Sequence, residues 1–154
     1  MRALVQRVKR ASVQFETGET RSIGPGLLIF LGVHETDEPQ LCEKLAKKCA
    51  QLRIFDDQAG KLNMSAVQLG YSAMVIPNFT LYADTHKGRR PSFITAAGVD
   101  KGRLNYTEFV RIMRKQGLKD VQTGEFGAGM QVELINDGPI TLMLDTQEWE
   151  TQKD

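Results

Sequence analysis

The side chains that most often perform catalysis are few in this chain and form no familiar constellation. It has 154 residues, with two histidines and two cysteines: His34, His86, Cys42 and Cys49. Neither histidine belongs to a recognisable serine or cysteine nucleophile motif, and there is no Gly-x-Ser-x-Gly or Walker loop. Without a Cys-x-x-Cys or His-x-x-x-His pair, we expect no metal site and no cofactor. Since the cysteines lie seven residues apart on one helix face, we expect buried thiols.

A proline interrupts a strand-like segment that reads Ile76-Pro77-Asn78-Phe79-Thr80-Leu81-Tyr82-Ala83-Asp84. Proline removes a donor from the hydrogen-bond ladder, so it belongs at a sheet edge or a bulge. A broken ladder leaves backbone groups free to meet a ligand, and bulges often lie beside active sites. The segment is therefore a candidate site, with a plain edge strand as the alternative.

A second unusual turn reads Asn136-Asp137-Gly138-Pro139. An X-Pro bond adopts the cis form at modest cost, and a cis bond in a folded protein usually serves a purpose. The sequence leaves the isomer open, and an ordinary turn between two strands is the alternative.

The most concentrated basic stretch is His86-Lys87-Gly88-Arg89-Arg90. The net charge of the chain is only +1, so it lacks the overall basic excess of many nucleic-acid-binding domains. Contact with RNA would therefore need a local patch such as this one. A solvated loop is the other interpretation.

The elements that would position these segments follow from hydrophobic periodicity. Strand patterns occur at six places: residues 2–15, 20–23, 27–33, 72–81, 121–123 and, around a Gly-rich turn, 130–135 with 140–145. A helix is predicted from a cap at Thr36 or Asp37, with Pro39 in its first turn. A second helix is predicted over about 101–116, with Tyr106, Phe109, Val110 and Met113 at core spacing.

This order of elements predicts an α+β fold in one domain, residues 1–147, with a frayed tail over 148–154. We expect a barrel-like antiparallel sheet with two main helices rather than alternating βαβ units. No secretory signal follows Met1, and the longest apolar stretch, Leu27 to Val33, is too short to cross a bilayer. The sequence thus predicts a cytosolic protein that does not enter a membrane.

An ordered series of motifs resembles the D-aminoacyl-tRNA deacylase family over nearly the whole chain. In sequence order the motifs are Met1 to Val8 (Met-x-Ala-Leu-Val-Gln-Arg-Val), Ala11-Ser12-Val13, Ile23-Gly24-Pro25-Gly26-Leu27-Leu28, Leu31-Gly32-Val33, Arg53-Ile54-Phe55, Gly60-Lys61-Leu62-Asn63, Phe79-Thr80-Leu81-Tyr82-Ala83-Asp84, Arg90-Pro91-Ser92-Phe93, Gln122-Thr123-Gly124, Met130-Gln131-Val132 and Asn136-Asp137-Gly138-Pro139. Each motif alone is weak evidence, but the ordered series is specific.

The resemblance implies a homodimer that hydrolyses the ester of D-aminoacyl-tRNA at its 3′ acceptor end, as a carboxylic ester hydrolase. In this family the Gly-Pro step is cis and enters the pocket of the partner subunit. By resemblance, the carbonyl oxygens of Gly138 and Pro139 hold the α-amino group, so an L side chain clashes with them. Glycine, which has no side chain, should also be accepted.

The same resemblance implies roles for other residues. Arg7 would brace the Gly-Pro loop, with an outward-pointing strand residue as the alternative, and Phe79 would line the pocket. Thr80 would position the substrate, because no base adjoins it in the sequence. The resemblance places Phe126, Gly127 and Ala128 near the terminal adenosine and adds Met130 to the substrate-binding residues. It implies phosphate contacts for Lys87, Arg89 and Arg90.

One departure from the family affects the expected chemistry. The usual motif reads Ser-Gln-x-Thr, whereas this chain has Pro77-Asn78-Phe79-Thr80. Loss of one oxyanion donor costs on the order of a hundredfold in rate. Two alternatives stay open: an editor with relaxed chirality that acts on L- or achiral aminoacyl-tRNA, and a non-catalytic dimer that binds tRNA or DNA ends.

Overall fold

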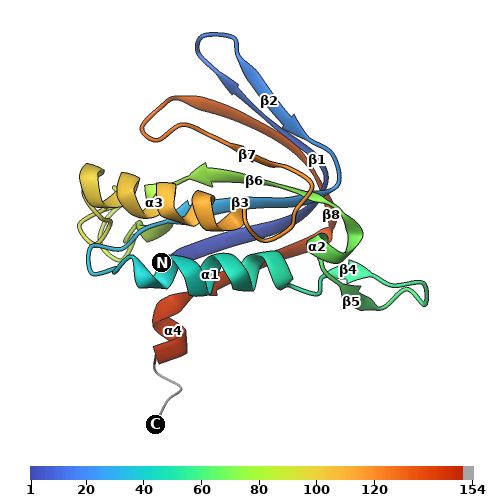
Figure 1. The fold of residues 1–154 in the computed structure, drawn as a ribbon. Coiled ribbons are helices and arrows are strands. Elements are labelled where there is room, and N and C mark those ends of the chain that lie inside the picture. The colour runs from blue at the N-terminus through green and yellow to red at the C-terminus, as the bar shows by residue number, and fades with distance from the viewer. Residues whose placement is uncertain (151–154) are drawn as a thin grey trace.

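The computed structural model describes residues 1–150 and shows a strongly curved sheet with helices packed on one side (Figure 1). The strands are β1 (Arg2–Phe15), β2 (Thr20–Ile23), β3 (Gly26–Gly32), β4 (Phe55–Asp56), β5 (Leu62–Met64), β6 (Ser72–Pro77), β7 (Val121–Thr123) and β8 (Met130–Asp145). The helices are α1 (Gln40–Gln51), α2 (Ala66–Leu69), the 3-10 helix η1 (Phe79–Tyr82), α3 (Val99–Met113) and α4 (Thr146–Glu150).

The long strand β1 organises the sheet. Its first half pairs with β3, its second half pairs with β2, and β8 pairs with it along the other edge. The register against β8 shifts on both sides of Val8, which marks an irregularity near the middle of β1. Such bulges bend a strand and increase its twist. The sheet therefore coils into a nearly closed barrel, as the sequence predicts.

The sheet is mixed: the pairs of β1 with β2, β3 and β8 are antiparallel, as predicted, but the sheet is not antiparallel throughout. β6 runs parallel to β3 and to β7. The chain passes through α1 between β3 and β6, and through α3 between β6 and β7. Parallel neighbours need long crossover connections of this kind, whereas a tight turn joins only antiparallel strands. The molecule thus contains two βαβ-type crossovers, which the sequence analysis did not predict.

β8 is one strand of 16 residues rather than two strands joined by a turn. The expected turn at residues 136–139 lies within it, where the pairing with β1 is irregular. After β8 the chain forms α4, and Trp149 packs against the larger core. The frayed tail was expected from residue 148; its last residues, 151–154, lie outside the described part of the chain.

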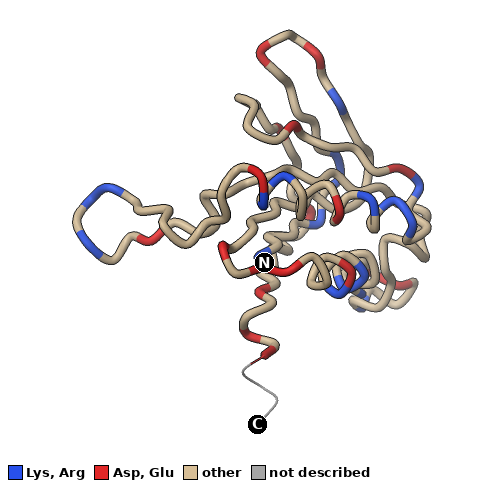
Figure 2. Tube along the Cα trace, turned by 60° about the vertical axis from the view of Figure 1, so that its left-hand side comes forward, with Lys and Arg blue, Asp and Glu red and all other residues tan. Residues whose placement is uncertain are grey.

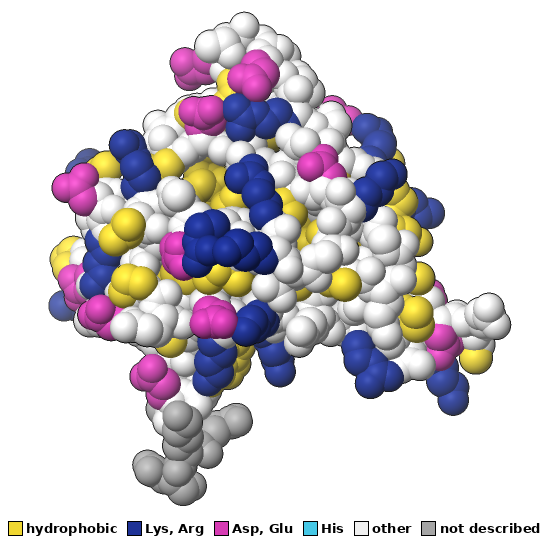
Figure 3. All heavy atoms as spheres, in the orientation of Figure 1, with side chains coloured by type: hydrophobic (Ala, Val, Ile, Leu, Met, Phe, Trp, Pro, Cys, Tyr) yellow, Lys and Arg dark blue, Asp and Glu magenta, His cyan; other side chains and the backbone are white. Residues whose placement is uncertain are grey.

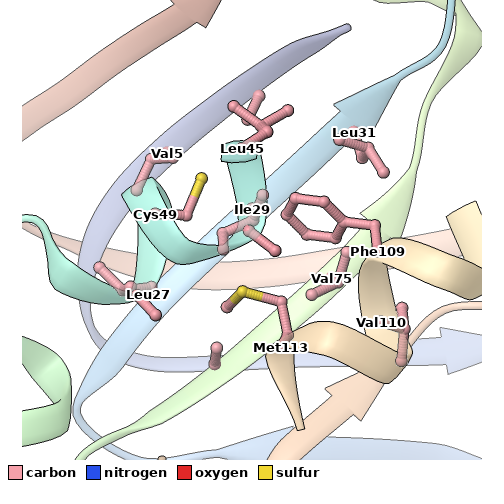
Figure 4. Close-up of a cluster of buried hydrophobic side chains, with 14 of the residues drawn as sticks. Val5, Leu27, Ile29, Leu31, Leu45, Cys49, Val75, Phe109, Val110 and Met113 are labelled. Carbon is pink, nitrogen blue, oxygen red and sulfur yellow. The ribbon is translucent and has the colours of Figure 1, made fainter. Parts of the chain in front are cut away.

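Two hydrophobic cores lie on opposite sides of the sheet. In the larger one, Leu45 and Cys49 of α1 and Phe109 and Met113 of α3 meet the sheet at Ile29 (Figure 4). The smaller one lies on the other face and contains Val8, Val13, Leu28 and Met74, each of which is at most 1% exposed. β3 contributes to both, which explains its unbroken apolar sequence.

Both predicted helices are present, but the start of α1 differs from the expectation. Pro39 occupies the N-cap position and no side chain caps the helix, so the predicted cap at Thr36 or Asp37 is wrong. The Asp37 carboxylate instead accepts from the Met1 ammonium group at 2.8 Å and from the His34 N–H at 2.7 Å. This buried ion pair fixes the start of β1 beside the loop that leads into α1.

Cys42 and Cys49 are free and buried, as predicted. Burial raises the pKa of each thiol from its ordinary value of 9.0 to about 12. None of the helices in residues 1–150 is long and apolar enough to cross a membrane.

Candidate active site

A cavity of about 320 Å³ opens where the three parallel strands β3, β6 and β7 end. Parallel strands share one carboxyl edge, so the segments that follow them meet at the same place, and ligands of such sheets often bind there. The first turn of α3 closes the other side. The cavity is lined by Leu31, Val33, Pro77, Asn78, Phe79, Ala97, Gly98, Val99, Gly102, Tyr106, Phe126 and Gly127.

Pro77 lies at the last position of a central strand, so the alternative of an edge strand is wrong. β6 is flanked by β3 and β7, and Pro77 is paired with Leu31 at its end. The next residue continues the ladder, because the Asn78 N–H donates to the Leu31 carbonyl at 2.8 Å. The chain then turns into η1, which replaces the predicted continuation of the strand to residue 81. The proline thus ends the strand at the cavity.

The Asn78 side chain caps η1 and orders the segment that contains Thr80. Its Oδ1 atom accepts the Thr80 N–H at 3.1 Å and also the Thr80 hydroxyl. An amide oxygen is not a base, so this contact does not activate the hydroxyl as a nucleophile. Thr80 is exposed and does not line the cavity, whereas Phe79 lines it.

Phe126 forms a wall of the cavity against α3. A Cβ atom on Gly102 would lie 3.0 Å from this ring, so glycine in the helix allows the ring to approach closely. The Arg103 guanidinium lies over the ring at 5.5 Å from its centroid, at a distance suited to a cation–π contact. Behind it, the hydroxyl of Tyr106 donates to the Val75 carbonyl at 2.9 Å, and burial raises the pKa of this phenol.

Two of the four binding residues predicted between positions 126 and 130 do not line this cavity. Ala128 is exposed in the loop after Phe126. Met130 packs against the smaller core and lies beside a separate hollow near Phe15. Of that predicted segment, only Phe126 and Gly127 reach the cavity.

Gly138 and Pro139 form an exposed kink in β8, and the peptide bond between them is cis. Gly138 has φ +152, and a Cβ atom there would lie 2.3 Å from the Ile140 nitrogen, so no other residue fits without a shift. Neither residue lines the cavity of its own chain.

Arg7 is buried and braces this kink, whereas an outward strand residue was the alternative. Its Nε donates to the Asp137 carbonyl at 2.8 Å, and its Nη1 donates to the Ile54 carbonyl at 2.9 Å. Asn136 adds a second brace, since its Nδ2 donates to the Arg7 and Ile140 carbonyls at 3.0 Å. The rigid fork of an arginine suits such a pair of carbonyl contacts.

The basic run lies in a loop that projects from the body of the molecule (Figure 2). Backbone hydrogen bonds of 2.7 and 2.8 Å between Asp84 and Ser92 close the base of the loop. Lys87, Arg89 and Arg90 are all exposed. The Asp84 carboxylate accepts from the His86 backbone N–H and ring, and these hydrogen bonds lower its pKa.

Comparison with known proteins identifies the relatives of this chain. The family model described as D-Tyr-tRNA(Tyr) deacylase matches residues 4–145. The chain belongs to the D-aminoacyl-tRNA deacylase family. The D-aminoacyl-tRNA deacylase of Deinococcus deserti is 52% identical over 94% of this chain and 99% of its own. That of Thermotoga petrophila is 47% identical over 96% of this chain and 99% of its own.

Solved structures show the same deacylase-family fold. The c-Myc DNA unwinding element binding protein is 36% identical, with a TM-score of 0.87 over 94% of this chain and 98% of its own. A probable eukaryotic D-amino acid tRNA deacylase has a TM-score of 0.84 over 94% of this chain and 98% of its own, at 14% identity, and supports the fold alone.

Several cavity residues of this family member were not among the predicted site residues. Leu31 and Val33 at the end of β3, and Val99, Gly102 and Tyr106 of α3, line the cavity. Tyr106 was expected only as a core residue of its helix. The one signal in the sequence was Gly102, because glycine is unfavourable inside a helix and often marks a close approach.

Proposed function

We propose that the chain hydrolyses the ester that joins a D-amino acid to the terminal ribose of tRNA, releasing the free D-amino acid and tRNA. Gly-tRNA would be a second substrate. The family match over residues 4–145 carries this proposal, and the cavity at the carboxyl ends of β3, β6 and β7 supplies a place for the acylated end. The reaction would take place in the cytosol.

The active form would be a homodimer in which the Gly138-Pro139 kink of one subunit enters the cavity of the other. The kink is exposed and does not line the cavity of its own chain, and both observations support this arrangement. The carbonyl oxygens of the kink would accept from the α-ammonium group of the substrate. With the amino group and ester fixed, an L side chain points into the kink and a D side chain points away. Each 1.4 kcal/mol of clash gives about tenfold discrimination.

The chemistry needs few groups, because an aminoacyl ester is already activated. Phe79 is the first residue of η1. The first N–H groups of a helix have no acceptor within the helix, so the Phe79 N–H is available to a ligand. The Oδ1 of Asn78 is occupied by Thr80, which orients the amide and leaves its Nδ2 hydrogens to donate. These two groups would stabilise the oxyanion that forms when water attacks the ester carbonyl. Thr80 would act as a positioning residue.

The rest of the substrate would follow the walls of the cavity. The terminal adenine would pack against the Phe126 ring, which Gly102 and Arg103 hold in place. Lys87, Arg89 and Arg90 would meet phosphates of the acceptor end. Ala128 lies in the loop after Phe126 and Met130 begins β8. Because neither lines the cavity, they would act only by positioning these segments.

A second candidate keeps the fold and relaxes the chirality. Pro77 and Asn78 replace the Ser-Gln of the family motif, and both line the cavity. Proline has neither the hydroxyl nor the N–H of serine, and asparagine reaches one carbon less far than glutamine. An editor of L- or achiral aminoacyl-tRNA would show comparable rates on matched D and L substrates.

The deciding experiment compares deacylation of D-Tyr-tRNA, L-Tyr-tRNA and Gly-tRNA by purified protein, with and without a chelator. We expect D-Tyr-tRNA and Gly-tRNA to be hydrolysed in both conditions, L-Tyr-tRNA to be spared, and sedimentation to show a dimer. Equal D and L rates would favour the relaxed editor. Binding without turnover of any substrate by the folded dimer would favour a non-catalytic end-binding protein and refute the proposal.

A further inference from the structure

Two exposed aromatic rings stand beside the mouth of the cavity. Phe79 and Phe93 form a T-shaped pair with ring centroids 5.0 Å apart. In the single subunit they are 55% and 37% exposed, although Phe79 also lines the cavity. A large ring left in water is unfavourable unless something covers it, and a contiguous exposed apolar patch usually marks a binding surface. The pair therefore extends the cavity outwards.

The charges beside this pair indicate what covers it. Phe93 directly follows the projecting loop with the exposed Lys87, Arg89 and Arg90 (Figure 2). Within residues 1–150 no acidic side chain forms an ion pair with these three cations. By contrast, the basic side chains over α1 and α3 alternate with acidic ones (Figure 3), as in the pairs Lys47–Glu43 and Arg111–Glu108. The unneutralised charge thus lies on the loop that leads to the aromatic pair.

We propose that Phe79 and Phe93 form a stacking platform for the unpaired bases that precede the terminal nucleotide of the RNA substrate. This inference rests on the proposed function. Aromatic rings beside unneutralised cations characterise sites for single-stranded nucleic acid, since bases stack on the rings while phosphates meet the cations. The order along the surface is cavity, aromatic pair, basic loop, which is the order that a single strand entering the cavity by its 3′ end requires. A protein partner offers no reason for this order.

The test separates the platform from the cavity by changing the length of the substrate. kcat/KM is measured on D-Tyr-tRNA and on D-tyrosyl-adenosine, which has no preceding nucleotides. The variants are Phe93→Ala, Phe93→Trp, and the matched control Ile94→Ala, an adjacent aliphatic side chain that is 82% exposed. The quantity compared is kcat/KM for D-Tyr-tRNA divided by kcat/KM for D-tyrosyl-adenosine. We expect Phe93→Ala to lower this ratio by about tenfold or more, because KM for the tRNA rises. Phe93→Trp restores the ratio, and Ile94→Ala leaves it unchanged.

An unchanged ratio in Phe93→Ala would overturn the proposed platform, even if the rates for D-Tyr-tRNA and D-tyrosyl-adenosine both fell. A structural defect in the Phe79 segment would lower the two rates together and leave their ratio unchanged. If the wild-type protein hydrolysed neither substrate, the proposed function would fail on its own. Fluorescence anisotropy with a labelled single-stranded RNA ending in CCA then decides the platform. Weaker binding by Phe93→Ala than by Ile94→Ala supports it, and equal binding by the two variants refutes it.

Discussion

Arg7 donates to carbonyl oxygens from two segments that are far apart in the sequence, Ile54 and Asp137. A lysine has one compact head group and cannot reproduce both contacts, so Arg7→Lys leaves a buried carbonyl unpaired. We expect a loss of about 1–3 kcal/mol in the free energy of unfolding. If the Gly138-Pro139 kink holds the substrate, kcat/KM for D-Tyr-tRNA should also fall about tenfold or more. Urea unfolding and a deacylation assay measure the two effects.

The matched control for Arg7 lies on the same strand. Arg10 forms an exposed ion pair with Glu133 at 3.2 Å. Because such pairs contribute little, Arg10→Lys should change the free energy of unfolding by less than about 0.5 kcal/mol. Equal effects of the two substitutions would contradict the bracing role.

Thr80 offers a test of covalent against positional chemistry. Its hydroxyl donates to the Asn78 amide oxygen, so Thr80→Val removes a contact that orients the amide but removes no activated nucleophile. We expect kcat to fall by about tenfold, with Thr80→Ser close to the wild type. Loss of a true nucleophile costs on the order of a millionfold. A loss of that size in single-turnover assays of Thr80→Val would contradict the positional role.

At the scale of single residues, the sequence identified side chains but not their partners. It placed Phe79 and Phe126 at the site, where both line the cavity. It could not decide whether Arg7 points outwards, because its partners Ile54 and Asp137 are brought to it only by the folded sheet. The prediction of Asp37 as a helix cap is wrong for a similar reason: its partner, the Met1 ammonium group, is far away in the sequence, and local spacing cannot reveal that ion pair.

Among the elements, the parallel pairing of β3 with β6 depends on the absence of one side chain. Gly26 begins β3 opposite Ser72. A Cβ atom on Gly26 would lie 1.8 Å from the Ser72 carbonyl oxygen, and a backbone atom cannot move away without displacing the strand. Overpacking costs about 1–3 kcal/mol and sometimes more. We expect Gly26→Ala to cost at least about 3 kcal/mol or to prevent folding.

Gly24 provides the control for this substitution, since a Cβ atom there meets nothing within 4 Å. Gly24→Ala should leave the urea midpoint near that of the wild type. A similar loss in both variants would mean that the flexibility of the turn, and not the strand contact, decides the effect.

The elements themselves were largely predictable, and their pairing was not. The apolar run of β3 and the stripes of α1 and α3 are local patterns that directly reflect burial. The direction of β6 relative to β3 depends instead on where α1 packs, which no local pattern records. Pro77 was expected at a sheet edge or a bulge because proline lacks a donor, yet it lies at the end of a central strand, where the ladder continues through the Asn78 N–H.

For the whole molecule, the larger core contains two thiols that are neutral in the folded state. Burial raises the pKa of Cys42 and Cys49 to about 12, whereas the ordinary value of 9.0 applies once the chain unfolds. Between pH 9 and about pH 12, each thiol loses its proton in the unfolded chain but keeps it in the folded protein. The folded state is therefore favoured fully below pH 9 and progressively less as the pH rises towards 12.

Cys49 has no exposed surface, so it should account for up to about 1.4 kcal/mol of stability lost per pH unit within this range. Urea unfolding at several values from pH 8 to pH 11 gives the slope for the wild type and for Cys49→Ala. The variant should be less stable at pH 8, because it leaves a cavity, yet its stability should fall less steeply with pH. Parallel slopes would show that the Cys49 thiolate is accommodated in the core. Alkaline sensitivity would then have to come from the Cys42 thiol and from the buried phenols of Tyr82 and Tyr106, whose pKa values burial also raises.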